Sequence, residues 1–88
     1  MACTVRIPSP LRSYTNGTAT TQANGSTVAE VLADLDRRFP GMRFRMIDEQ
    51  DRIRQHIRLY VNTRAATHLG ERVQTGDEVH LICALTGG

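Results

Sequence analysis

One segment of this chain has the pattern of an amphipathic helix, and it constrains the fold more than any other feature. Apolar residues recur at helical spacing along residues 28–39 and form one face: Val28, Val31, Leu32, Leu35 and Phe39. The opposite face is polar and carries Glu30, Asp34, Arg37 and Arg38. Thr27 and Glu30 form a capping box that predicts the helix start, and Pro40-Gly41 predicts its end. We therefore expect one main helix whose apolar face covers another layer.

Alternation of apolar and polar side chains predicts strands on both sides of that helix. The alternation is clear in residues 3–8, 57–62 and 78–85, and it predicts strands with one buried face. Residues 18–23 form a more polar strand, which is expected at an edge of the sheet. Residues 9–17 are rich in Pro, Ser, Asn and Gly and are expected to form a loop.

Two further segments have weaker patterns. Residues 42–54 mix charges with apolar residues, which suits a short irregular or helical segment that turns its apolar side chains into the core. Those apolar residues are Met42, Phe44, Met46 and Ile47. Residues 62–76 are expected to form an excursion that ends in a turn at residues 75–77.

The order of these elements predicts an α+β fold. It runs strand, strand, helix, strand, strand, so the natural architecture has two layers, with a mixed sheet of four to five strands packed on one main helix. The second strand should pair antiparallel with the first, and the first and last strands should lie parallel in the middle of the sheet. That arrangement is the β-grasp, or ubiquitin-like, fold. Residues 1–88 are expected to form one such domain with a flexible tail at residues 86–88.

Composition argues against several classes of function. A net charge of +2 is too small to indicate nucleic-acid binding. Two cysteines, expected at distant places in the sheet, neither form a disulfide framework nor fit a zinc site, which predicts a reducing, cytoplasmic setting. No apolar run is long enough to span a membrane. All 11 basic side chains are Arg, so the chain offers no lysine for self-conjugation, although GC-rich coding also explains that absence.

The chemically suggestive feature is the pair of glycines that ends the sequence, Gly87-Gly88. Glycine has no Cβ, so an extended Gly-Gly segment can enter a narrow channel of another protein and present a carboxylate there. A free carboxylate is inert toward nucleophiles until a partner converts it to a mixed anhydride such as an acyl-adenylate. No serine stands in a nucleophile motif and no phosphate-binding glycine loop occurs, so the chain itself is not expected to be an enzyme.

With these features in view, the sequence resembles the MoaD/ThiS family of ubiquitin-like sulfur carriers. The resemblance rests on the order of elements and on three motifs: Val61-Asn62, Gly76-Asp77-Glu78-Val79 and Gly87-Gly88. Within the family, Ile7-Pro8-Ser9-Pro10-Leu11-Arg12 with Thr15 and Gly17 is similar to carriers that serve synthesis of cysteine or another sulfur-containing metabolite. The resemblance implies that Gly88 is the adenylation and thiocarboxylate site and that Gly87 belongs to the tail motif.

The resemblance also implies a set of partners. An adenylating and sulfurtransferase enzyme, related to the ubiquitin activators, would use ATP and Mg to activate Gly88, so the carrier binds no cofactor of its own. A sulfur-accepting synthase, resembling cysteine synthase or of another kind, would consume the thiocarboxylate. A metallopeptidase could then release the product and regenerate the glycine end.

The last strand also carries candidate docking residues. Its alternation predicts Val79, Leu81 and Cys83 inward, with His80, Ile82 and Ala84 outward. His80, Ile82 and the nearby Tyr60 would make a small apolar patch for a partner, and Leu85 joins them as a candidate. The alternative is that Ile82 is an isolated surface residue. No carboxylate or cysteine is spaced to support His80 as a catalytic base or metal ligand, so neither a catalytic nor a metal site is predicted.

Three other functions remain open on the sequence alone. The chain could be a ubiquitin-like modifier that forms amide bonds to lysines, the small subunit of molybdopterin synthase, or a binding module in which the glycines play no role. A modifier would form lysine adducts, and a synthase subunit would co-purify stably with a large catalytic subunit. A binding module would keep its function when both glycines are removed.

Overall fold

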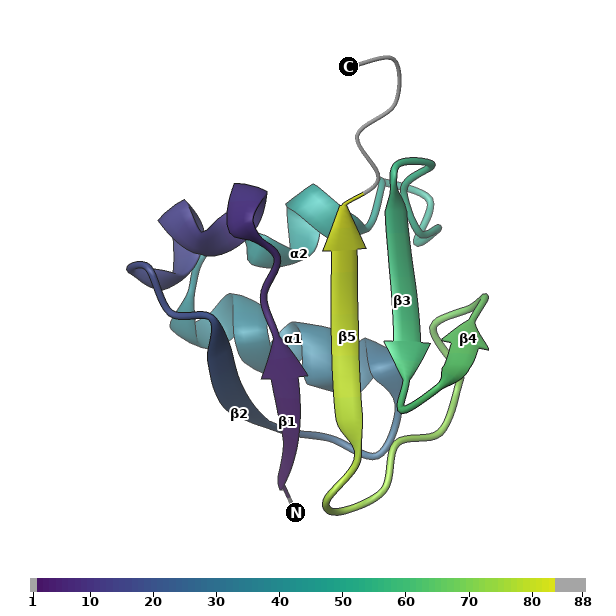
Figure 1. Cartoon of the computed structure of the whole chain (residues 1–88). Helices are drawn as coiled ribbons and strands as arrows, with labels where there is room; N and C mark the ends of the chain where they lie inside the picture. The colour runs from purple at the N-terminus through teal and green to yellow at the C-terminus, as the bar shows by residue number, and fades with distance from the viewer. Residues whose placement is uncertain (1, 84–88) are drawn as a thin grey trace.

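The computed structural model describes residues 2–83 and contains a five-stranded sheet in the order β2-β1-β5-β3-β4. Figure 1 shows the helices α1 and α2 on one side of this sheet, while the other side is open. The elements in chain order are β1 (Ala2–Arg6), η1 (Ser9–Thr15), β2 (Thr20–Asn24), α1 (Val28–Arg38), α2 (Met42–Met46), β3 (Ile57–Val61), β4 (Arg64–Ala66) and β5 (Glu78–Cys83).

The predicted topology is confirmed. The central strands β1 and β5 are parallel, with Val5 opposite Val79, while β2 pairs antiparallel with β1 at one edge. On the other side of β5, strand β3 pairs antiparallel in a register that places Leu59 opposite Leu81. This is the ubiquitin-like β-grasp arrangement, and its central parallel pair fixes the direction in which β5 runs.

The core lies between the sheet and α1. Cys3, Val5 and Ile7 are buried as their alternation predicts, and so are the apolar residues of β3 and β5 that face the helices. From α1, the apolar face supplies the buried side chains Val28, Val31, Leu32 and Leu35. Phe39 packs against the core but is only partly buried, because the helix already ends at Arg38.

The helix starts where the capping box predicts, with one difference in its hydrogen bonds. The Glu30 amide donates to Thr27 Oγ1 at 3.2 Å, which caps the helix. The Glu30 carboxylate turns instead to the preceding residue and accepts from the Ser26 amide at 2.8 Å and the Ser26 hydroxyl at 2.9 Å. These hydrogen bonds lower the pKa of the Glu30 carboxyl below its ordinary value. In a standard capping box this carboxylate accepts from the amide of the N-cap residue, here Thr27. In this chain the hydrogen bond is shifted by one residue, to Ser26.

Two segments differ from their predictions. Residues 9–17 are not simply a loop, because Ser9–Thr15 forms the short 3-10 helix η1, with a proline in its first turn and Leu11 and Thr15 buried. Buried Thr15 is satisfied because its hydroxyl donates to the Thr18 carbonyl at 2.9 Å. The excursion at 62–76 contains a further strand, β4, which pairs with Leu59–Val61 of β3. Its three residues are too few to show an alternation in the sequence.

The segment after α1 is helical, as its composition allows, but one of its apolar residues faces outward. Met42, Met46 and Ile47 are buried, whereas Phe44 is 61% exposed. The prediction that Phe44 enters the core is therefore wrong. One turn of an α-helix takes about 3.6 residues, so in the five-residue helix α2 the buried face passes through Met42 and Met46, and Phe44 lies opposite.

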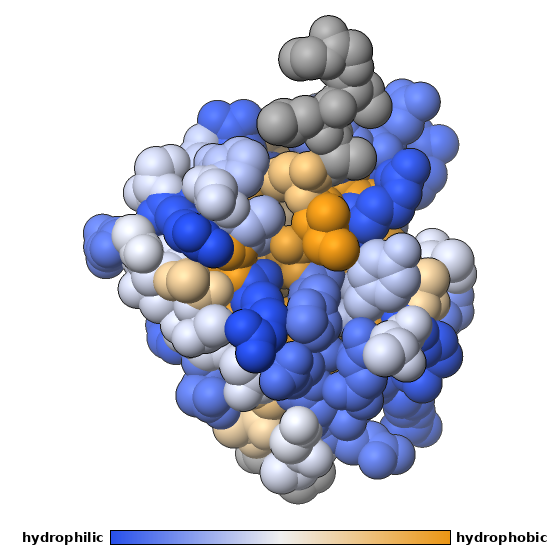
Figure 2. Space-filling view, viewed as in Figure 1, coloured by the Kyte–Doolittle hydropathy of each residue, from blue (hydrophilic) through white to orange (hydrophobic). Residues whose placement is uncertain are grey.

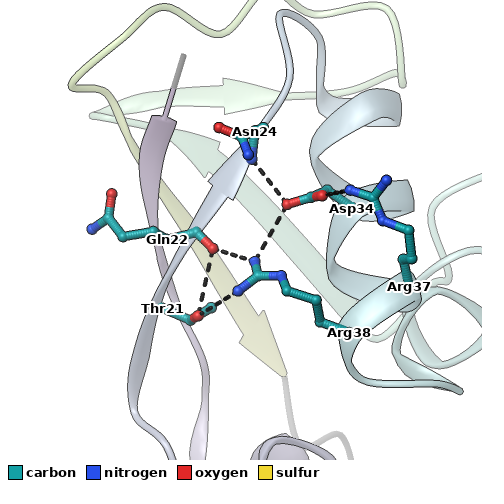
Figure 3. Close-up of polar contacts among 6 residues, drawn as sticks. All are labelled: Thr21, Gln22, Asn24, Asp34, Arg37 and Arg38. Carbon is teal, nitrogen blue, oxygen red and sulfur yellow. Dashed lines mark hydrogen bonds and ion pairs between the residues drawn. The ribbon is translucent and has the colours of Figure 1, made fainter.

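Asp34 is the other correction, because it lies on the predicted solvent face of α1 but is only 6% exposed. Strand β2 passes beside that face, and the Asn24 amide donates to Asp34 Oδ2 at 3.0 Å (Figure 3). Arg37 and Arg38 both pair with the same carboxylate, and the Arg38 guanidinium also donates to the Gln22 carbonyl. Asp34 thus joins the edge strand to the helix through a fully paired buried charge.

Replacing Asp34 with Ala should destabilise the fold strongly. The substitution leaves the Asn24 amide and the Arg38 guanidinium without their shared acceptor, and loss of one partner from a buried charged pair costs on the order of 3 kcal/mol. Arg37→Gln is the matched control, because the Arg37 side chain is 72% exposed, and it should cost less than about 0.5 kcal/mol. Urea unfolding of the variants measures both values, and equal stabilities would contradict this assignment.

Candidate functional site

The predicted reactive residue lies just beyond the part of the chain that the structure describes. Gly88 and Gly87, the docking candidate Leu85, Ala84 and the predicted tail at residues 86–88 all fall outside residues 2–83. The structure therefore bears on this site through β5, the strand that leads to it, and through the surface around Cys83. We call the end of the sheet at which β5 finishes the Cys83 end, and the opposite end, at which β5 begins, the Asp77 end.

Strand β5 is a rigid, central element. Val79 and Leu81 are buried against the helices, as predicted, and Cys83 is partly buried. Both neighbouring strands pair with β5, β1 from one side and β3 from the other. Strand β1 pairs with Glu78–His80 of β5, and β3 pairs with Val79–Cys83, so the pairing with β3 alone holds the last residues of β5 up to Cys83.

The predicted docking residues occupy the open face of the sheet. His80 lies directly opposite Tyr60, and Ile82 lies opposite Arg58 and diagonal to Tyr60. Ile82 is 43% exposed, and Figure 2 shows apolar surface gathered on this face near the end of β5, with polar surface around it. The expected proximity of Tyr60, His80 and Ile82 is thus confirmed, while their role in docking stays a prediction.

The prediction that no carboxylate is spaced to support His80 is wrong, because Glu78 lies beside its ring. His80 Nε2 lies 3.1 Å from Glu78 Oε1, and Glu78 also accepts from Arg6 Nε at 3.2 Å. The hydrogen bond and charge of Arg6 lower the pKa of the Glu78 carboxyl, with a smaller effect from His80. The signal was available, because residues two apart on a strand share a face. Arg6, Glu78 and His80 are accessible to solvent and already paired with one another, which is typical of a surface ion pair.

At the Asp77 end, the two family-like motifs of the sequence meet. Asn62 Nδ2 donates to Asp77 Oδ1 at 3.1 Å, and the Glu78 amide donates to Asn62 Oδ1 at 3.0 Å. Asp77 also accepts from the Gln74 amide at 2.8 Å, and these bonds lower the pKa of its carboxyl. The Thr4 amide donates to the Asp77 carbonyl at 3.0 Å. The Asn62 side chain thus links the end of β3 to the start of β5, and the Thr4–Asp77 backbone bond links β1 to the same point.

The same contact explains why Asn and Gly stand at these positions. Asn62 has φ 58° and Gly76 has φ 89°, both in the left-handed region that most side chains avoid. Glycine enters this region freely, and asparagine does so more readily than other residues. The sequence motif is therefore a structural requirement of the sheet and places no reactive group.

The two cysteines are both free. Cys3 is buried and Cys83 is partly buried, and burial raises the pKa of each thiol above its ordinary value. A raised pKa keeps a thiol protonated and poorly nucleophilic near neutral pH. The prediction that they form no internal disulfide is confirmed. Among residues 2–83, no group of three His, Cys, Asp or Glu side chains could hold a metal ion.

Comparison with known proteins gives the family. The profile of the ThiS family matches residues 5–88, which includes the motifs at both ends of β5. The chain belongs to the ThiS family. It is also 31% identical to the sulfur carrier protein CysO of Mycobacterium tuberculosis over 93 aligned residues, which cover 100% of both chains.

Solved structures agree with this assignment. The ThiS-family chain is similar to the solved BexX/CysO complex from Amycolatopsis orientalis, with a TM-score of 0.91, 32% identity, and coverage of 98% of this chain and 99% of that one. It is also similar to the small archaeal modifier protein SAMP1 from Haloferax volcanii, with a TM-score of 0.83, 25% identity and coverage of 100% of both chains. The fold is therefore shared by proteins described as carriers and as modifiers.

Among the described residues of this ThiS-family chain, every buried side-chain nitrogen or oxygen has a hydrogen-bond partner. These residues contain no helix with the length and apolar character that crossing a membrane requires.

The contact at the Asp77 end predicts a difference between two variants of Asn62. Asn62→Gly keeps the left-handed backbone accessible but removes both side-chain hydrogen bonds, so it should cost about 1–2 kcal/mol. Asn62→Ala removes the same bonds and adds backbone strain of about 1 kcal/mol. Thermal and urea unfolding should rank the wild type above Asn62→Gly and that variant above Asn62→Ala. A wild-type stability for Asn62→Ala would show that the contact contributes nothing.

Proposed function

We propose that this chain is a sulfur carrier that donates sulfur from its Gly88 carbonyl. In the proposed cycle, Gly88 is adenylated and converted to a thiocarboxylate for synthesis of cysteine or another sulfur-containing metabolite. The observation that carries the proposal is the full-length similarity to a sulfur carrier protein CysO, and the Gly87-Gly88 pair of this chain is consistent with it. The chain itself acts as a carrier, and its partners supply the catalysis.

The chemistry proceeds in two steps. A carboxylate oxygen of Gly88 attacks the α-phosphorus of ATP in a Mg-dependent partner enzyme, which forms an acyl-adenylate and releases pyrophosphate. A sulfide equivalent from a sulfurtransferase then attacks the activated carbonyl and expels AMP, which leaves a thiocarboxylate on Gly88. The anionic sulfur is a strong nucleophile that, in a synthase, can displace a leaving group from a carbon atom of the acceptor, which forms a carbon–sulfur bond and leaves the product attached to the Gly88 acyl group. Water, activated by a metallopeptidase, then hydrolyses the bond between the Gly88 acyl group and the product, which releases the product with its sulfur and restores the Gly88 carboxylate.

The fold supports this role by holding the strand before the reactive residue in one position. Glycine at 87 and 88 permits passage through a narrow channel, while the paired backbone of β5 limits the orientations in which the carrier can approach. The open sheet face around Ile82 and Tyr60 is proposed to rest on the partner during that approach, because exposed apolar side chains near a reactive group favour burial against another protein.

A second candidate function is conjugation to proteins. The similarity to a small archaeal modifier protein favours it, because that protein has the same fold and matches this chain over the full length of both. In that case the acyl-adenylate would be transferred to a lysine amine and form an amide, and no sulfur would be retained. Lysine-linked adducts in cells that disappear when Gly88 is deleted would support this candidate against the carrier.

Incubation with the cognate activating enzyme, ATP, Mg and a sulfur donor should raise the intact mass by about 16 Da, because one oxygen is exchanged for sulfur. Deletion of Gly88 should abolish the gain, while the Asn62→Gly variant at the opposite end of the sheet should retain it. The carrier function would be contradicted if the wild-type chain kept its original mass while the same enzyme preparation added sulfur to another carrier protein.

Ile82→Arg should weaken the interaction with the activating enzyme, because it places a charge in the centre of the proposed apolar contact. The expected result is a rise of about tenfold in the KM for the carrier, with little change in kcat. Ala33→Arg adds the same charge on the exposed face of α1 and is the matched control. Equal KM values for the two variants would mean that the open sheet face is not the contact surface.

A further inference from the structure

The arginines of this chain differ in whether a carboxylate neutralises them. Six of the eleven pair with Asp or Glu within the described residues: Arg6, Arg37, Arg38, Arg43, Arg52 and Arg64. The remaining five have no such partner in residues 2–83: Arg12, Arg45, Arg54, Arg58 and Arg72. Four of these five belong to elements at the Cys83 end, and Arg72 alone lies elsewhere, between β4 and β5. Positive charge without local compensation is thus concentrated at one end of the molecule.

Three of these arginines are linked through neighbouring residues, and we call Arg45, Arg54 and Arg58 the arginine row. Arg54 stacks over the Phe44 ring, with its guanidinium carbon 4.7 Å from the ring centre, and donates to the Phe44 carbonyl at 2.7 Å. Phe44 directly precedes Arg45 in α2. Arg58 donates to the carbonyl of Gln55, which follows Arg54, at 2.7 Å. The row therefore runs from α2 through the loop before β3 into β3 itself.

Each guanidinium in the row is held by a neutral group. Arg45 stacks over the Tyr14 ring at 5.0 Å and also donates to the Tyr14 hydroxyl, whereas Arg54 and Arg58 use backbone carbonyls. Neutral acceptors orient a guanidinium without cancelling its charge, and they occupy only some of its five N–H donors. Because the side chains are already oriented, an anionic partner would lose less conformational entropy on binding them.

The row borders the site of the proposed function. Arg58 lies opposite Ile82 across the β3–β5 pairing, and Arg45 lines a hollow together with Cys83, the last described residue of β5. Acidic residues of the adjoining loop are mostly engaged, since Asp48 pairs with Arg52 and Asp51 with Arg43. Glu49 is the carboxylate there without an ion pair among the described residues. Arg58 thus lies beside Ile82 and Arg45 beside Cys83, while Arg54 stands between them in the row.

We propose that the arginine row is the docking surface for an acidic protein surface, formed by Asp and Glu side chains around the channel that Gly88 enters on the activating enzyme. This inference rests on the proposed function, because it assigns the chemistry of the enzyme surface that meets the carrier. Carboxylates can accept two parallel hydrogen bonds from one guanidinium, so such a rim fits the free donors of the row. Ile82 would then form the apolar centre of the contact and the row its charged border.

Binding of an acidic peptide tests the row without any enzyme. In a ¹⁵N NMR titration with hexaglutamate at low salt, the Arg side-chain Nε–H signals of the row should shift, and the shifts should vanish at about 0.5 M salt. The Arg72 signal should not move, because that arginine lies away from the Cys83 end. A single-stranded RNA oligomer is titrated in parallel. Uniform shifts over all arginines, or tighter binding of the RNA to the row, would overturn the proposal.

The enzyme reaction separates this inference from the proposed function. Arg45→Gln with Arg58→Gln should slow thiocarboxylate formation about tenfold at subsaturating carrier and low salt, and should flatten its salt dependence. Arg64→Gln with Arg72→Gln removes the same charge elsewhere and should react at the wild-type rate. If both double variants match the wild type, the row is not the docking surface although the carrier function stands. If no chain gains sulfur, the proposed function itself fails.

Discussion

The parallel pairing of β1 and β5 at the centre of the sheet is the constraint on which the rest of the structure depends. Two parallel neighbours cannot be joined by a short turn, so the connection between them has to cross from one end of the sheet to the other. That connection supplies α1, which covers the sheet, and β3, which pairs with the other side of β5. The direction of β5, and with it the end of the sheet from which residue 84 continues, is set by this pairing.

The two ends of the sheet differ in what their polar groups contact. At the Asp77 end, Asn62, Asp77 and Glu78 hydrogen-bond one another, and this closed network fixes the strands. At the Cys83 end, the guanidinium groups of the arginine row are held by neutral acceptors and keep their charge available. The stabilising network and the proposed docking surface thus lie at opposite ends of the sheet. A substitution that damages the first end can be expected to change folding, whereas one at the second changes how the chain meets a partner.

Features with a local cause could be predicted from the sequence. The burial of Val5 and Val79 follows from alternation, and the start of α1 follows from the Thr27 cap, because each depends on residues within a few positions. The family resemblance also rested on visible motifs. Asp34 could not be predicted in this way, because its burial depends on β2 lying beside the helix. The exposure of Phe44 and the existence of β4 likewise depend on which elements become neighbours in the fold.

The residues of the candidate site also differ in whether they could be predicted from local sequence. Gly88 follows from the sequence alone, and Tyr60, His80 and Ile82 follow from strand alternation together with the predicted pairing of β3 and β5. The arginine row could not be read from the sequence, because a count of charges does not show which arginines are neutralised. Only the contacts distinguish Arg58, which meets carbonyls, from Arg64, which pairs with Glu71. Local pattern thus predicts the candidate reactive residue, and tertiary contacts define the surface at the Cys83 end.

The central claim is that Gly88 carries sulfur in the living cell. The most direct test purifies the protein from its native cells under conditions that preserve thio acids, alkylates it, and locates the modified residue by tandem mass spectrometry. The expected result is an alkylated thiocarboxylate at Gly88, with slower modification of Cys3 and Cys83 near neutral pH, because Cys3 is buried, Cys83 is partly buried and both thiols have raised pKa values. A Gly88 that is always an ordinary carboxylate or is found only in amide linkage to lysine would contradict the central claim.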